Sequence, residues 1–178
     1  MQFLRRVIGS LSSDPRAHRG AASTGRRRSR IELETLESRD LLSIAGVTLQ
    51  YGNLAITGTQ SSGNAAHVWI DPSTHNVEVS LNGQSEEFTA AQVSNITYKS
   101  GAQGGDAFVN DTGLTSLAYG YGGSNQFTGG TGYNYIYFFG NNNTYTAEEG
   151  SISAVWEGHG KGDKIVNPYH ASVTVYAY

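Results

Sequence analysis

The chain has 178 residues, which is room for one modest domain and a tail. Its 23 glycines and 11 tyrosines, set against one methionine and three prolines, favour many short strands and turns over helices. The absence of cysteine excludes a disulfide framework, and no apolar run is long enough to cross a bilayer.

Charge divides the chain into two segments. Residues 1–40 carry nine arginines against five acids (+4), and the remainder carries three lysines against ten acids (−7), which together give the formal −3. A basic arm followed by an acidic body predicts two segments with different roles. No aromatic residue interleaves with the basic cluster at 26–30, and together with the acidic body this argues against nucleic-acid binding.

The arm, residues 1–43, is expected to be a partly helical or disordered targeting tail. Its first apolar stretch is too short for a standard secretory signal, and no small-residue cleavage site follows closely. Residues 33–42 read Leu-Glu-Thr-Leu-Glu-Ser-Arg-Asp-Leu-Leu and resemble the LEPR-XLL segment of bacterial secreted and surface proteins, with Thr35 at the family's usual proline. The resemblance implies an extracellular or cell-surface location.

Residues 44–100 have the pattern of a small antiparallel β cap. Val47–Tyr51 and Leu54–Thr57 alternate apolar and polar side chains around Gly52 and Asn53, which indicates strand, turn and strand. Asn82-Gly83 is a two-residue hairpin signal between further strand-like runs. Such a cap would cover the exposed edge of a stacked coil that follows it.

Residues 101–178 carry a nine-residue repeat, seen best in Gly-Gly-Thr-Gly-Tyr-Asn-Tyr-Ile-Tyr at 129–137. Each unit has a polar position followed two residues later by an apolar one, with a one-residue slip around Tyr119. The polar positions are Asp106, Thr115, Asn125, Asn134 and Asn143. The apolar positions, which form the predicted core, are Phe108, Leu117, Phe127, Ile136 and Tyr145. The expected fold is all-β, a short parallel β-roll or β-helix.

This repeat resembles the RTX, or hemolysin-type calcium-binding, β-roll over residues 101–146, with asparagine at the family's aspartate position. The resemblance implies turns on two opposite edges, with Asp106, Asn125 and Asn143 on one edge and Thr115 and Asn134 on the other. It also implies that a metal would lie between stacked turns.

Only one of the five repeat positions is a carboxylate, and calcium affinity follows the number of charged oxygen ligands. Stacked asparagines can instead hydrogen-bond to one another and to the turn backbone. We therefore expect asparagine ladders in place of calcium bridges, so that the cofactor is either none or weakly bound calcium. The candidate metal ligands are Asp106, Asp111, Asn125, Asn134, Asn143 and Asp163. An Asx-turn at Asp106 is the alternative interpretation.

The sequence shows no catalytic constellation. Its histidines have no paired metal-ligand spacing, and the doublets Glu86-Glu87 and Glu148-Glu149 place adjacent side chains on opposite faces of a strand. Tyr133, Tyr135 and Tyr137 should project outward and could contact carbohydrate or another chain. The expected function is a non-catalytic structural or adhesive surface module whose partners are cell-surface polysaccharide or other surface proteins. The alternatives are a calcium-binding RTX-like module and a polysaccharide-processing β-helix enzyme.

Overall fold

The computed structural model describes residues 44–158 and 160–177. The targeting tail and its LEPR-XLL-like segment therefore lie outside the described residues. All of the described residues belong to one compact unit. No helix in this part of the chain is long and apolar enough to span a membrane.

The described unit is all-β and consists of two seven-stranded sheets. The first sheet contains, in spatial order, β1 (Val47–Gln50), β2 (Asn53–Thr57), β6 (Asn95–Lys99), β8 (Thr115–Gly120), β10 (Tyr133–Phe138), β12 (Ile152–Glu157) and β14 (Ser172–Ala177). The second contains β13 (Lys164–Val166), β11 (Thr144–Thr146), β9 (Gln126–Thr128), β7 (Ala107–Asp111), β3 (Ala65–Ile70), β4 (Val77–Leu81) and β5 (Gln84–Phe88). A short 3-10 turn, η1 (Ala90–Gln92), follows β5.

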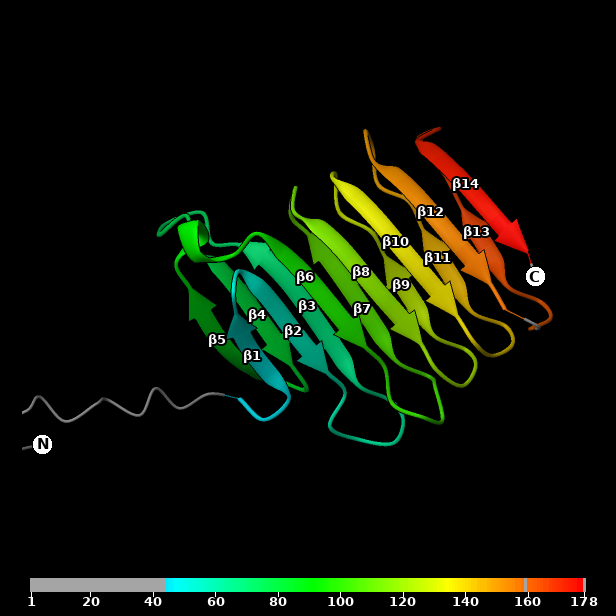
Figure 1. The fold of residues 1–178 in the computed structure, drawn as a ribbon, viewed down its shortest axis with the longest axis horizontal. Coiled ribbons are helices and arrows are strands. Elements are labelled where there is room, and N and C mark those ends of the chain that lie inside the picture. The colour runs from blue at the N-terminus through cyan, green and yellow to red at the C-terminus, as the bar shows by residue number, and fades with distance from the viewer. Residues whose placement is uncertain (1–43, 159, 178) are drawn as a thin grey trace, which may run out of the picture. The chain divides into compact units, whose positions relative to one another are not determined.

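The chain alternates between the sheets, and this alternation makes a stacked coil. Strands β6, β8, β10, β12 and β14 pair in parallel in the first sheet, as do β7, β9, β11 and β13 in the second. Figure 1 shows these strands following one another along the unit, from β5 and β1 at one end to β13 and β14 at the other. The expected all-β parallel coil is confirmed.

Antiparallel pairing is confined to the N-terminal end. Strand β1 pairs with β2, and β3, β4 and β5 form an antiparallel meander, as expected for a cap. Strands β2 and β3 also pair in parallel with β6 and β7. Both sheets therefore run without a break across residue 100, and the parallel coil already includes part of the segment expected to form the cap.

The core is a thin apolar layer between the sheets, built from alternate residues of each strand. Four of the five predicted core residues, Phe108, Phe127, Ile136 and Tyr145, are at most 1% exposed. Tyr98 stacks on Phe108 with ring centroids 4.7 Å apart, and Phe127 meets both rings edge-on. Aromatic side chains thus connect successive strands within the core.

The fifth prediction, Leu117, is wrong. Leu117 is only half-buried, and its neighbours Ser116 and Ala118 are the residues that point inward from β8. The repeat position assigned to Thr115 therefore belongs to Ser116, which pairs with Asn134. Because side chains alternate along a strand, an error of one residue exchanges the two faces.

The extra residue lies before β8 and not around Tyr119, where the slip was expected. A polar turn accommodates it: Asn110 Oδ1 accepts hydrogen bonds from the Thr112 backbone N–H (3.1 Å) and hydroxyl (2.7 Å). The Thr112 hydroxyl oxygen in turn accepts a hydrogen bond from the Leu114 N–H at 3.1 Å. Asn110 and Thr112 are buried, so these bonds satisfy polar groups that water cannot reach.

Candidate functional site

A ladder of amide and carboxylate side chains runs along one edge of the coil. Each member is the residue immediately before a strand of the second sheet. The members of this Asn/Asp ladder are Asn64, Asp106, Asn125, Asn143 and Asp163. Three of them, Asp106, Asn125 and Asn143, are the residues that the repeat placed on one edge. Asn64 was missed because four strands, β3 to β6, separate it from the repeats.

Each rung of the Asn/Asp ladder accepts hydrogen bonds from the rung before it. The backbone N–H and side-chain amide of Asn125 donate to Asn143 Oδ1 at 3.0 and 2.9 Å. The same two groups of Asn143 donate to Asp163 Oδ1 at 2.7 and 3.2 Å. Asn125 Nδ2 also donates to the Tyr121 carbonyl in its own turn at 3.0 Å. The expected asparagine ladder is therefore present.

Asp106 fits this ladder as an acceptor. Its Oδ1 accepts hydrogen bonds from the backbone N–H (2.7 Å) and side-chain amide (3.1 Å) of Asn64. Its Oδ2 accepts from the same amide at 3.1 Å and from the Gly101 N–H. Asp106 is 1% exposed, so protein N–H groups take the place of solvent around its carboxylate oxygens.

The opposite edge carries a shorter set of polar contacts around Asn134. Asn134 Oδ1 accepts hydrogen bonds from the Ser116 hydroxyl at 2.7 Å and from the Gly130 N–H at 3.1 Å. In the next coil Ser153 occupies the equivalent position and shares a 2.7 Å hydrogen bond with the Tyr145 hydroxyl. Asn134 therefore lies on the other edge as expected, but with serines beside it and not Thr115.

The candidate metal ligands do not converge on one point. Asp106, Asn125, Asn143 and Asp163 form successive rungs of the Asn/Asp ladder, Asn134 lies on the opposite edge, and Asp111 lies on the outer face of the second sheet. Within residues 44–158 and 160–177, no group of three or more histidine or acidic side chains is arranged to hold a metal ion. The ladder oxygens of Asp106, Asn125 and Asn143 instead accept hydrogen bonds from N–H donors, as does Asp163 Oδ1.

Two buried tyrosines have raised pKa values. Burial, with a smaller contribution from the charge of Asp106, raises the pKa of Tyr98 far above its ordinary value. Burial also raises the pKa of Tyr145 to about 12, although the hydrogen bond from Ser153 acts in the opposite direction. The Tyr98 hydroxyl is buried and has no hydrogen-bond partner within the described part of the chain.

The outer face of the first sheet carries a continuous row of aromatic rings, which we call the aromatic ladder. Its main column follows the strand register from β8 to β14, and further rings flank it. The column is Tyr119, Tyr137, Trp156 and Tyr176, and the flanking rings are Tyr121, Tyr135 and Phe139. The outward projection expected for Tyr133, Tyr135 and Tyr137 agrees with their places on β10, where the alternate residues Asn134 and Ile136 are buried.

The rings of the aromatic ladder stack on one another. Ring centroids lie 5.3 Å apart between Tyr119 and Tyr137, 4.5 Å between Tyr137 and Trp156, and 5.0 Å between Trp156 and Tyr176, with interplanar angles of 5° to 19°. These distances follow the spacing between strands. Because the faces cover one another, ring edges and polar tips are what the column presents to solvent.

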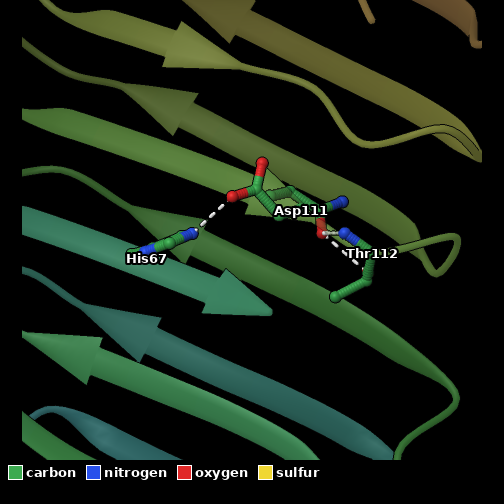
Figure 2. Close-up of polar contacts among 4 residues, drawn as sticks. His67, Asp111 and Thr112 are labelled. Atoms are coloured by element: carbon green, nitrogen blue, oxygen red, sulfur yellow. Dashed lines mark hydrogen bonds and ion pairs between the residues drawn. The ribbon is translucent and has the colours of Figure 1, made fainter. Parts of the chain in front are cut away.

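The outer face of the second sheet carries a contact between a histidine and an aspartate that the sequence did not reveal. His67 Nε2 on β3 lies 2.6 Å from Asp111 Oδ2 at the end of β7, and both side chains are substantially exposed (43% and 52%). Figure 2 shows the two side chains pointing toward each other across neighbouring strands. Trp69 lies beside the imidazole, with ring centroids 4.6 Å apart. The pair is separated by 44 residues, so no local motif connects its members.

The comparisons with known proteins add no relative. No family model, no curated protein and no solved structure matches this chain.

Proposed function

We propose that this chain is a non-catalytic β-solenoid module of an extracellular or cell-surface protein, with a structural and adhesive role. Two features support the proposal. One edge of the coil is held by hydrogen bonds between stacked side chains, which suits a rigid scaffold. The outer face of the first sheet carries the aromatic ladder, the feature best suited to contact a partner.

The observation that carries the adhesive role is the exposure of the aromatic ladder. Tyr121, Tyr135, Phe139 and Tyr176 are each more than a third exposed. Exposed aromatic rings are uncommon away from contact surfaces, and tyrosine offers both an apolar body and a hydroxyl. A neutral surface polysaccharide or a flat protein surface could pack on the ring edges and hydrogen-bond to the hydroxyls.

The two tryptophans of the chain allow this role to be tested directly. Trp156 lies in the aromatic ladder and Trp69 lies on the outer face of the other sheet. In a Trp69→Phe variant, Trp156 is the sole tryptophan, and its fluorescence should change on titration with a polysaccharide that binds. The matched Trp156→Phe variant, which retains Trp69, should show no change. A panel of neutral and acidic polysaccharides that leaves Trp156 unaffected would remove polysaccharide as the partner.

We further propose that the module does not depend on calcium. The carboxylate of Asp106 already accepts hydrogen bonds from three N–H groups, the backbone and side-chain amides of Asn64 and the Gly101 N–H, and the neighbouring rungs present amides in place of acids. Calcium requires six to eight oxygen ligands, and inserting it here would require breaking these hydrogen bonds. We expect the melting temperature of the full chain to be the same with calcium and with a chelator.

Calcium binding is the second candidate because of Asp163. Its Oδ2 is buried and has no hydrogen-bond partner among the described residues, whereas the corresponding amide of Asn143 donates to the Gly140 carbonyl at 2.9 Å. A cation beside Asp163 would satisfy this oxygen. Calcium should then raise the melting temperature of the wild-type chain, and Asp163→Asn should abolish the rise. That pair of results would replace the calcium-independent proposal.

A further inference from the structure

Both ends of the stacked coil terminate in strands whose outer edges pair with no other described strand. These edge strands are β1 and β5 at the N-terminal end and β14 and β13 at the C-terminal end. An open edge presents unpaired backbone N–H and C=O groups, and proteins commonly cover or charge such edges to prevent association. The four edges can therefore be compared as docking surfaces.

The two ends are stepped in complementary ways. At the N-terminal end the first sheet has one strand beyond β2, whereas the second sheet has two strands, β4 and β5, beyond β3. The second sheet therefore projects by one strand. At the C-terminal end β14 lies beyond β12, whereas β13 is the last strand of the second sheet, so the first sheet projects. Figure 1 shows β5 and β14 as the outermost strands at the two ends.

We propose that the protein associates head to tail, with the C-terminal end of one copy docked on the N-terminal end of the next. In this arrangement β14 of one copy lies beside β1 of the next copy. In the other sheet, β5 of the next copy lies beside β13 of the first. Strand directions follow from the ladders: β14 would lie antiparallel to β1, and β13 parallel to β5. Both sheets then continue without a gap.

The side chains at the two ends suit this contact. On β14, Val173 and Val175 continue the inward-facing columns of Ser153 and Val155, and Val175 is 45% exposed. On β1, Leu49 packs partly against the core from the opposite end. The two ends of the second sheet carry opposite charges, with Glu78 and Glu87 on β4 and β5 and Lys164 on β13, which favours the approach of unlike ends.

Glu86 limits the strength of the contact. It occupies an inward-facing position on β5, opposite the buried Val79, and its Oε2 accepts a hydrogen bond from the Ile44 N–H at 3.1 Å. An inward-pointing charge on an edge strand is a common protection against edge pairing. Stacking would remove water from this carboxylate, so the association should be weak and reversible.

A two-fold dimer through β14 fits the ends less well. Two copies of β14 could pair and extend the first sheet, but each second sheet would stop one strand short, leaving both β13 edges open. Head-to-tail docking is heterologous, so it generates chains of molecules and not closed pairs.

The test is sedimentation velocity of the full chain over a dilution series, using variants that block one end at a time. Val175→Lys places a charge at the C-terminal edge, and Leu49→Lys places one at the N-terminal edge. Thr128→Lys adds the same charge on the outer face of β9, away from both ends. If Leu49→Lys loses its cooperative melt, Gln84→Lys on the exposed start of β5 replaces it.

The wild-type chain and Thr128→Lys should increase in mass with concentration, whereas each end-blocked variant alone should stay monomeric. An equimolar mixture of the two blocked variants should form a one-to-one dimer, because each retains the end that the other lacks. Glu86→Gln should shift the average mass upward at equal concentration. A monomeric wild type, or a Leu49→Lys variant that still forms dimers, would overturn head-to-tail docking. The outcome is independent of what the aromatic ladder binds.

Discussion

Two buried tyrosines differ in whether their hydroxyl group has a partner. Tyr145 shares a 2.7 Å hydrogen bond with Ser153, whereas the Tyr98 hydroxyl has no partner among the described residues. An unsatisfied buried hydroxyl destabilises a protein by about 1 to 3 kcal/mol, and a satisfied one stabilises it by about 1 kcal/mol. We expect Tyr98→Phe to preserve or raise the free energy of unfolding and Tyr145→Phe to lower it by about 1 kcal/mol. Urea unfolding measures both, and equal destabilisation would contradict this account.

The same tyrosines make the protein sensitive to alkali. The pKa of Tyr145 is about 12 in the folded protein, against an ordinary value of 10.0, and the pKa of Tyr98 is also raised. The folded chain therefore holds protons that the unfolded chain releases. Stability is fully present below pH 10 and is lost as the pH rises through the folded-state values, by about 2 to 3 kcal/mol for Tyr145.

Chemical denaturation below and above pH 10 measures this loss. The Tyr145→Phe variant is the control, because it lacks one of the two groups and should lose less stability over the same range. A wild type whose free energy of unfolding is constant across that range would show that these hydroxyls are accessible to solvent.

At the scale of one element, the Asn/Asp ladder predicts that its central rung is the most sensitive. Asn125 is fully buried, accepts a hydrogen bond from the Asp106 N–H at 3.1 Å, and donates to Asn143 and to the Tyr121 carbonyl. Asn125→Ala leaves the Asp106 N–H buried without a partner, removes the amide donor to Asn143 Oδ1, and leaves the Tyr121 carbonyl with the Ser100 hydroxyl alone. We expect a loss of roughly 3 kcal/mol or more in the free energy of unfolding.

Asn141→Ala is a matched control for this substitution. Asn141 also accepts a backbone hydrogen bond, from the Lys161 N–H at 2.7 Å, but it does so at the exposed surface. Water can replace that partner, so the loss should be well under half that of Asn125→Ala. Similar losses for the two variants in urea unfolding would mean that the ladder does not carry the stability assigned to it.

The sequence predicted the elements better where the repeat length was constant. Asn125, Asn134 and Asn143 are nine residues apart, and each lies on the edge that the nine-residue repeat gives it. Between Asp106 and Ser116 the spacing is ten, because the turn at Asn110–Leu114 holds one more residue. A glycine and a threonine stand where the nine-residue repeat expects them, so the insertion could not be recognised from the sequence. Thr115 and Leu117 were therefore assigned to the inner face of the strand, although they lie on the outer one.

Contacts between distant strands could not be read from local patterns. The outward direction of the tyrosines on β10 follows from alternation. The stacking of Tyr137 on Trp156, and of Trp156 on Tyr176, depends instead on the register of three strands. The His67 and Asp111 pair likewise requires β3 and β7 to be neighbours. That neighbourhood is a consequence of the coil closing around a long insertion, which no motif within either strand encodes.

At the scale of the whole molecule, a stacked coil is nearly one-dimensional, because each strand contacts mainly its two neighbours. The local stability of its strands should therefore decline toward those ends of the coil that bury little apolar surface. Strand β8 lies between β6 and β10 and buries Ala118 completely, whereas β14 has one neighbour and leaves Val175 and Tyr176 nearly half exposed. At the other end β1 has one neighbour too, but Val47 on this strand is buried, and so is the preceding Ile44, whose carbonyl accepts a hydrogen bond from the Val47 N–H.

Hydrogen exchange measures this gradient strand by strand. At high dilution, where copies are separate, we expect backbone amides of β14 to exchange fastest, those of β1 at an intermediate rate, and those of β8 slowest, because opening an end strand exposes less apolar surface than opening a central one. Val175→Ala removes part of the small apolar surface that β14 buries. It should therefore speed amide exchange in β14 and leave exchange in β8 unchanged. Equal rates in the three strands would show that the coil opens as one cooperative unit and not from its C-terminal end.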